Sequence, residues 1–148
     1  MRRLVTVLML SISIASLEAQ TAPKIDPAKA TTLPSGVQTQ DLRVGKGAPA
    51  EKGRLARVLY TGWLAKEGFI FDQRSDRNKP YDFVLGSGKV IKGWEEGVPG
   101  MRVGGKRRVF IPAKLAYGDK GTRGVPPKSD LVFEIELVGA GPPPKKTT

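Results

Sequence analysis

Hydrophobic and polar side chains alternate most clearly near the end of the chain. From Leu131 to Leu137 every second residue is apolar, and glutamates occupy two of the positions between. Successive side chains of a strand point to opposite faces of a sheet, so this pattern predicts a half-buried strand. Similar runs occur at 56–60, 81–85 and 109–111, and a weaker one at 37–44. The pattern therefore predicts about five strands.

A single stretch has the periodicity of a helix. Its apolar residues recur at intervals of three and four, at Ile91, Trp94 and Val98. Ser87 is a candidate N-cap, and Gly97 ends the pattern. Strands lie on both sides of this helix in the sequence without a repeating βαβ pattern, so we predict the α+β class, with one short helix covering a mainly antiparallel sheet.

On the inner face of that helix, Trp94 would meet aromatic strand residues, namely Tyr60, Tyr81, Phe83 and Phe133. Gly93 and Gly97 would leave little side-chain bulk around the indole. Two interpretations are open: ordinary core packing, which is the usual role of aromatic clusters, or the aromatic floor of a binding hollow.

The ends of the chain differ in composition from its middle. Two arginines, an apolar run and small residues predict a signal peptide at 1–19, too short for a transmembrane helix, so we expect export to the periplasm or beyond, without a membrane span after cleavage. We further predict a flexible leader at 20–35, one domain at 36–140 and a disordered tail at 141–148.

Composition narrows the chemistry. The chain contains neither cysteine nor histidine, which excludes thiol nucleophiles, imidazole-based triads and the usual zinc sites. We therefore predict no metal and no cofactor. The net charge is +11, but the basic residues are scattered and are densest at 106–108. This distribution favours a solvated face over a specific nucleic-acid site, although an anionic surface remains an alternative partner.

Short motifs follow one another through the domain: VLYTG at 58–62, FD at 71–72 with RNKP at 77–80, FVLG at 83–86, VIKGWEEG at 90–97, AYG at 116–118, and PP at 126–127 before LVFEIEL at 131–137. In this order they closely resemble the FKBP-type peptidyl-prolyl cis-trans isomerases, the macrolide-binding immunophilins. The resemblance covers nearly all of 36–140. It implies a twisted antiparallel sheet of about five strands wrapped around one short helix.

The resemblance also implies a site in which a substrate proline ring rests on the Trp94 indole. The surrounding residues would be Tyr60, Phe71, Val90, Ile91 and Phe133, with Phe83 behind, Tyr81 towards the rim, and Ala116 and Val125 as further binding residues. Tyr117 would donate a hydrogen bond to a substrate carbonyl, and so would the Ile91 backbone N–H. Asp72 is the polar member, and Arg77 would hold it and Tyr60 in position.

The loop at 118–127 is one residue shorter than in the best-known family members, and Val125 is all that remains of its apolar tip. The implied function is rotation of X–Pro bonds in exported proteins, by a monomer that binds proline-containing segments and macrolides such as tacrolimus or rapamycin. The shortened loop leaves an alternative open, a proline-peptide binding module or holdase with little turnover.

Overall fold

The computed structural model describes residues 21–143 and 145, so the predicted signal peptide and half of the predicted tail lie outside the described residues. Its elements, in chain order, are β1 (Thr31–Thr32), β2 (Gln38–Arg43), β3 (Leu55–Leu64), β4 (Ile70–Arg74), β5 (Tyr81–Val84), α2 (Lys92–Gly97), β6 (Lys106–Ile111), a 3-10 turn at Ala113–Leu115 and β7 (Leu131–Gly141). No helix in this part of the chain is long and apolar enough to cross a membrane.

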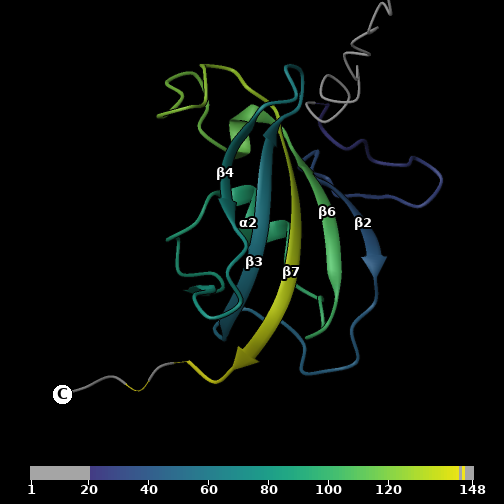
Figure 1. Ribbon diagram of the computed structural model, residues 1–148, viewed down its shortest axis with the longest axis vertical. Coiled ribbons are helices and arrows are strands. Elements are labelled where there is room, and N and C mark those ends of the chain that lie inside the picture. The colour runs from purple at the N-terminus through teal and green to yellow at the C-terminus, as the bar shows by residue number, and fades with distance from the viewer. Residues whose placement is uncertain (1–20, 144, 146–148) are drawn as a thin grey trace, which may run out of the picture.

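All strands join one antiparallel sheet, in the order β1-β2-β6-β7-β3-β4 (Figure 1). The ten residues of β3 also pair with β5, so that β5 and β4 follow one another along the same edge of β3. This arrangement confirms the α+β class. The sheet has seven strands rather than about five, because sequence alternation did not reveal the two-residue β1 or the irregular β4.

The helix lies against one face of the sheet, which is called the inner face below, and the strands pass in front of it in Figure 1. On this face Val58, Val109 and Ile135 are completely buried. A Cβ added to Gly93 would lie 2.3 Å from Ile111 Cγ2, and one added to Gly97 would lie 2.7 Å from Val109 Cγ1. The two glycines therefore bring α2 close to β6, rather than leaving space around the Trp94 ring as expected.

The helix is also shorter than the sequence pattern indicated. It begins at Lys92, and its N-cap position, Ile91, makes no side-chain capping bond. Ser87 is not the cap, because the chain at 85–91 first makes a turn. The Glu95 carboxylate holds that turn by accepting hydrogen bonds from the backbone N–H groups of Gly86 and Gly88.

The segment expected to be a flexible leader is bonded to the sheet over its described part. Thr31 and Thr32 pair with β2 as β1. Further upstream, Arg108 Nη1 donates to the Lys24 carbonyl at 2.7 Å, and the Asp26 N–H donates to Gln40 Oε1 at 2.9 Å. These long-range contacts join the segment to the sheet although its sequence has no periodicity.

Candidate functional site

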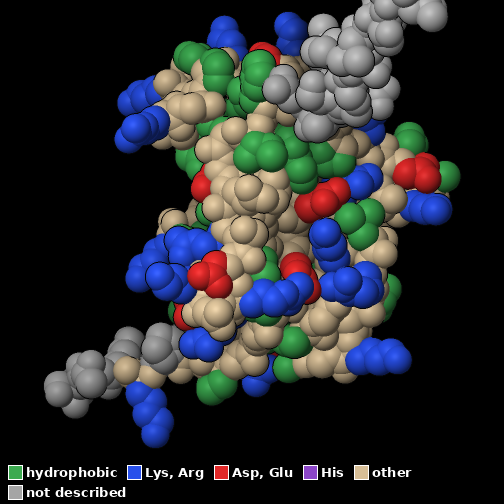
Figure 2. All heavy atoms as spheres, in the orientation of Figure 1, with side chains coloured by type: hydrophobic (Ala, Val, Ile, Leu, Met, Phe, Trp, Pro, Cys, Tyr) green, Lys and Arg blue, Asp and Glu red, His purple; other side chains and the backbone are tan. Residues whose placement is uncertain are grey.

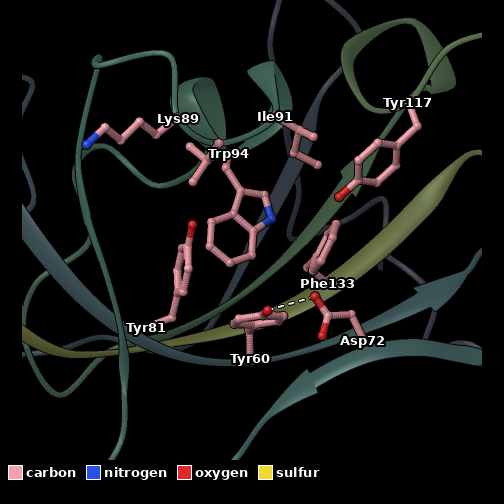
Figure 3. Close-up of a pocket in the computed structure, with 9 residues that line it drawn as sticks. Tyr60, Asp72, Tyr81, Lys89, Ile91, Trp94, Tyr117 and Phe133 are labelled. Carbon is pink, nitrogen blue, oxygen red and sulfur yellow. Dashed lines mark hydrogen bonds between the residues drawn. The ribbon is translucent and has the colours of Figure 1, made fainter. Parts of the chain in front are cut away.

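Between α2 and the inner face of the sheet lies a hollow of about 280 Å³ (Figure 3). Its lining residues are Tyr60, Asp72, Tyr81, Lys89, Val90, Ile91, Trp94, Tyr117 and Phe133. The volume is slightly below the range of roughly 300–1,000 Å³ that is usual for small-molecule sites. The hollow therefore suits one ring and its flanking backbone better than a large cofactor.

Trp94 is the centre of an aromatic cluster around this hollow. Its ring centroid lies 4.9 Å from that of Tyr60 and 5.3 Å from that of Phe133, with both pairs nearly perpendicular. Tyr81 meets it edge-on at 6.2 Å, and Phe83 packs at 5.6 Å. Edge-to-face pairs of this kind add stability beyond the area they bury. Trp94 is thus both a core residue, 4% exposed, and part of the lining of the hollow.

The indole N–H of Trp94 is buried and has no hydrogen-bond partner among the described residues. Figure 3 shows the indole nitrogen on the side of the ring next to Phe133. The two rings meet nearly perpendicular, with their centroids 5.3 Å apart. The arrangement helps to fix the orientation of the indole.

A β-bulge shapes the wall that β4 contributes. Gly62 pairs with Asp72 and Trp63 pairs with Ile70, which leaves Phe71 as the extra residue. Bulges bend a strand and redirect its side chains. Here Phe71 packs against Phe133 at 5.5 Å while its neighbour Asp72 lines the hollow. Gly62 permits this packing, since a Cβ there would come within 3.0 Å of both aromatic rings.

Asp72 is held by Tyr60 and by its own strand. The Tyr60 hydroxyl donates to Asp72 Oδ2 at 2.7 Å, and the Gln73 N–H donates to Oδ1 at 2.8 Å. Burial and then this hydrogen bond raise the pKa of Tyr60 above the ordinary value for tyrosine. Burial, followed by the charge of Asp72, raises the pKa of Tyr117 as well. Both phenols are therefore protonated donors at neutral pH.

Arg77 does not lie as expected from the sequence. Its guanidinium binds both carboxylate oxygens of Glu136 at 2.9 Å, on the sheet face opposite α2. Glu136 also accepts from Arg43, so two long cationic side chains converge on one carboxylate. Tyr60 and the Gln73 backbone, rather than Arg77, position Asp72.

Other expected site residues lie outside the lining of the hollow. Phe71 and Phe83 support it from behind through Phe133 and Trp94. Ala116 is partly buried and packs against the core next to Tyr117. Val125 is 3% exposed and folded into its loop, where it exchanges backbone hydrogen bonds with Thr122, so it is not an exposed tip.

Lys89 lines the hollow although the sequence motifs did not indicate it. It precedes Val90 in the loop between β5 and α2, and Figure 3 places it on the opposite side of Trp94 from Tyr117. Its position directly before the VIKGWEEG motif was the feature of the sequence that could have indicated a place in the site.

Residues 46–138 match the family model for FKBP-type peptidyl-prolyl cis-trans isomerases. A FK506-binding protein of Neisseria meningitidis serogroup B is 48% identical over 104 residues, which cover 70% of this chain and 94% of that protein. FK506-binding protein 4 of Mycosarcoma maydis is 44% identical over 124 residues, covering 83% of this chain but 32% of that longer protein. The chain therefore spans about a third of the second relative.

A solved structure agrees with these sequence matches. The crystal structure of FkpA from Escherichia coli superimposes with a TM-score of 0.71 at 38% identity, over 78% of this chain and 53% of that one. The family match at 46–138 includes α2, the strands β3 to β6, most of β7 and every residue that lines the hollow. The motifs, the fold and these relatives agree, and the chain belongs to the FKBP-type peptidyl-prolyl cis-trans isomerase family.

Proposed function

We propose that this chain accelerates rotation about X–Pro peptide bonds in exported proteins, with the hollow around Trp94 as its active site. The observation that carries the proposal is the combination of an aromatic lining with groups that donate hydrogen bonds and have no internal acceptor. In the described part of the chain, no hydrogen bond uses the Tyr117 hydroxyl or the Ile91 N–H.

The reaction needs no acid, base or nucleophile. Resonance in the amide gives its C–N bond partial double-bond character and a rotational barrier of about 18–20 kcal/mol. At the barrier the nitrogen is pyramidal and the amide is less dipolar. Water stabilises the planar, polar amide, so a hollow of aromatic rings favours the twisted form over the ground state. A gain of about a million in rate would need roughly 8 kcal/mol of this preference.

The position of each group in the hollow determines the role that we assign to it. The substrate proline ring would rest on Trp94, and Tyr60 and Phe133 would enclose it. Tyr117 and the Ile91 N–H would bind carbonyls of the flanking chain, which holds the backbone while the amide rotates. Asp72 is bound by Tyr60 and acts as a positioning residue for that wall.

The test is isomerisation of short X–Pro peptides by the purified chain, with several residues as X. We expect exchange to be much faster than the spontaneous reaction, which takes tens to hundreds of seconds. Binding of the same peptides without faster exchange would favour the alternative, a proline-peptide binding module or holdase. Direct measurement of the exchange rate between the cis and trans forms, for example by line-shape analysis, distinguishes the enzyme from the binding module.

Two further properties belong to this proposal. Macrolides such as tacrolimus or rapamycin would occupy the same hollow and inhibit by competition with peptide. The apolar run near the N-terminus would direct export, and it would be removed near Ala19. Sequencing the N-terminus of the protein from an envelope or secreted fraction tests the second property, and an intact Met1 there contradicts it.

A further inference from the structure

The two sides of the hollow carry opposite charge. Asp72 and Tyr117 lie on one side of Trp94 in Figure 3, while Lys89 and Tyr81 lie on the other. The Arg74 guanidinium approaches the Tyr81 ring from outside, with its Cζ 5.8 Å from the ring centroid. We call Lys89, Arg74 and Tyr81 the Tyr81 flank.

The cations of this flank have no carboxylate partner in the described part of the chain. None of the ion pairs there uses Lys89 or Arg74, and Arg74 donates instead to the Lys79 carbonyl at 3.2 Å. Nearby acidic side chains are engaged elsewhere. Glu95 binds the backbone of the loop that carries Lys89, and Asp82 pairs with Arg57 at 3.3 Å.

Charge on the opposite side is only partly compensated. Asp72 accepts from Tyr60 and from the Gln73 N–H, both neutral donors, so its negative charge persists at the edge of the hollow. A peptide lying across Trp94 therefore passes from a cationic flank to an anionic side. Its own charged residues would experience different potentials at the two ends.

We propose that Lys89, the cation of the Tyr81 flank that lines the hollow, makes this chain selective for X–Pro segments that carry Asp or Glu next to the proline. This inference rests on the proposed function, because it concerns the substrate of the same hollow. Lys89 is exposed and has a long, flexible stem, so its ammonium can follow a carboxylate on either neighbour of the proline. At a separation of about 6 Å in water, the attraction amounts to about a threefold preference. Salt would weaken it, since the screening length falls to roughly 3 Å at 1 M.

The experiment compares peptides that differ only in Glu or Gln, placed directly before or directly after the proline. For each pair we would measure kcat/KM for isomerisation and, separately, Kd from tryptophan fluorescence. The chain is compared with Lys89→Gln and with Lys66→Gln, which removes an exposed lysine in the β3–β4 turn away from the hollow.

We expect the unmodified chain to prefer Glu over Gln about threefold at one of the two positions at low salt, and the preference to vanish near 1 M salt. Lys89→Gln should bring the ratio close to one, while Lys66→Gln should keep it. Equal values for Glu and Gln in the unmodified chain, or a preference that Lys89→Gln leaves intact, would overturn the inference. Loss of catalysis on every peptide would contradict the proposed function instead, and the Kd ratios would still decide the selectivity.

Discussion

The two faces of the central strands carry different chemistry, although their residues alternate along the same backbone. On β7, Phe133 is buried beside Trp94, and the next residue, Glu134, binds Arg108 on the other face. Glu134 and Glu136 together meet four cations, namely Arg43, Arg77, Lys106 and Arg108. Figure 2 shows this outer face, where basic and acidic side chains gather over the lower part of the sheet.

Because of this difference, the two faces of the sheet contribute differently to the stability of the chain. The lining of the hollow is continuous with the core, so a change there alters both the site and the free energy of unfolding. Charges on the outer face are screened by solvent and contribute little to stability. Changes on the outer face should therefore leave the hollow intact.

The largest effect is expected for Trp94→Ala. Removal of the indole deletes the floor of the hollow and leaves a cavity, so we expect kcat/KM to fall about 100-fold or more and the free energy of unfolding to fall by about 3–5 kcal/mol. Trp63→Ala is the matched control, because Trp63 pairs with Val132 at the outer face. It should change kcat/KM by no more than about twofold.

Loss of folding must be distinguished from loss of the site. Trp94→Leu keeps an apolar side chain in the core and should remain folded by circular dichroism, but it lacks the flat indole face. A Trp94→Leu protein with full activity would show that the indole is not the floor on which proline rests.

A smaller effect, on stability alone, is expected where α2 meets β6. Gly→Ala inside a helix ordinarily stabilises by up to about 1 kcal/mol. In Gly93→Ala, however, the new methyl group would lie 2.3 Å from Ile111 Cγ2 in a buried contact. Overpacking costs typically 1–3 kcal/mol, so we expect a net loss of about that size in denaturant titrations.

Gly141→Ala provides the comparison, because nothing lies within 4 Å of its added Cβ. The free energy of unfolding of this variant should stay within about 0.5 kcal/mol of the parent. Equal stabilities of Gly93→Ala and Gly141→Ala would mean that the helix can move away from β6 at little cost.

These contacts show what the sequence could and could not predict. The strands with regular alternation, such as β7, were predicted because one buried face imposes a period of two. The strand β4 was missed because the bulge at Phe71 breaks that period in IFDQR. The bulge is also the feature that brings Asp72 to the hollow.

Side-chain partners were less predictable than elements. Arg77 reaches Glu136, which is 59 residues away in sequence, and the motif around Arg77 contains no information about that carboxylate. Lys89 was missed for a related reason, since a loop residue follows no hydrophobic period. Five aromatic residues were easier to place, because each belongs to a strand or helix whose buried face was evident: Tyr60, Tyr81, Phe83, Trp94 and Phe133.

Tyr60→Phe and Glu136→Gln should differ in their effect on activity, and the difference is expected to be moderate. Tyr60→Phe removes the 2.7 Å hydrogen bond to Asp72, so we expect kcat/KM to fall by about three- to tenfold. Glu136→Gln weakens the ion pairs with Arg43 and Arg77 on the outer face and should lower stability by about 1 kcal/mol, with activity within twofold. Comparable losses of activity in both variants would show that Arg77 also acts on the hollow.

The smallest effect is expected from pH in the neutral range. Between about pH 5.5 and 8.5, kcat/KM should stay constant within about twofold, because the chain has no histidine or cysteine and X–Pro rotation transfers no proton. Burial and Asp72 raise the pKa of Tyr60 above the ordinary value of about 10. Its stabilising contribution is therefore complete below pH 10 and decreases as the pH rises towards the folded-state pKa, because only the unfolded chain releases that proton.

Tyr60→Phe tests this sign, because it removes the group responsible. Between about pH 9.5 and 11 the parent should lose more free energy of unfolding than Tyr60→Phe, by up to about 1.4 kcal/mol per pH unit, the limit for one proton. Denaturant titrations at several pH values measure the difference, and the variant corrects for lysines that titrate in the same range. A bell-shaped profile of kcat/KM near neutrality, once substrate ionisation is excluded, would instead reveal an acid and a base. Such a profile would show that an apolar hollow around Trp94 is an incomplete description of catalysis.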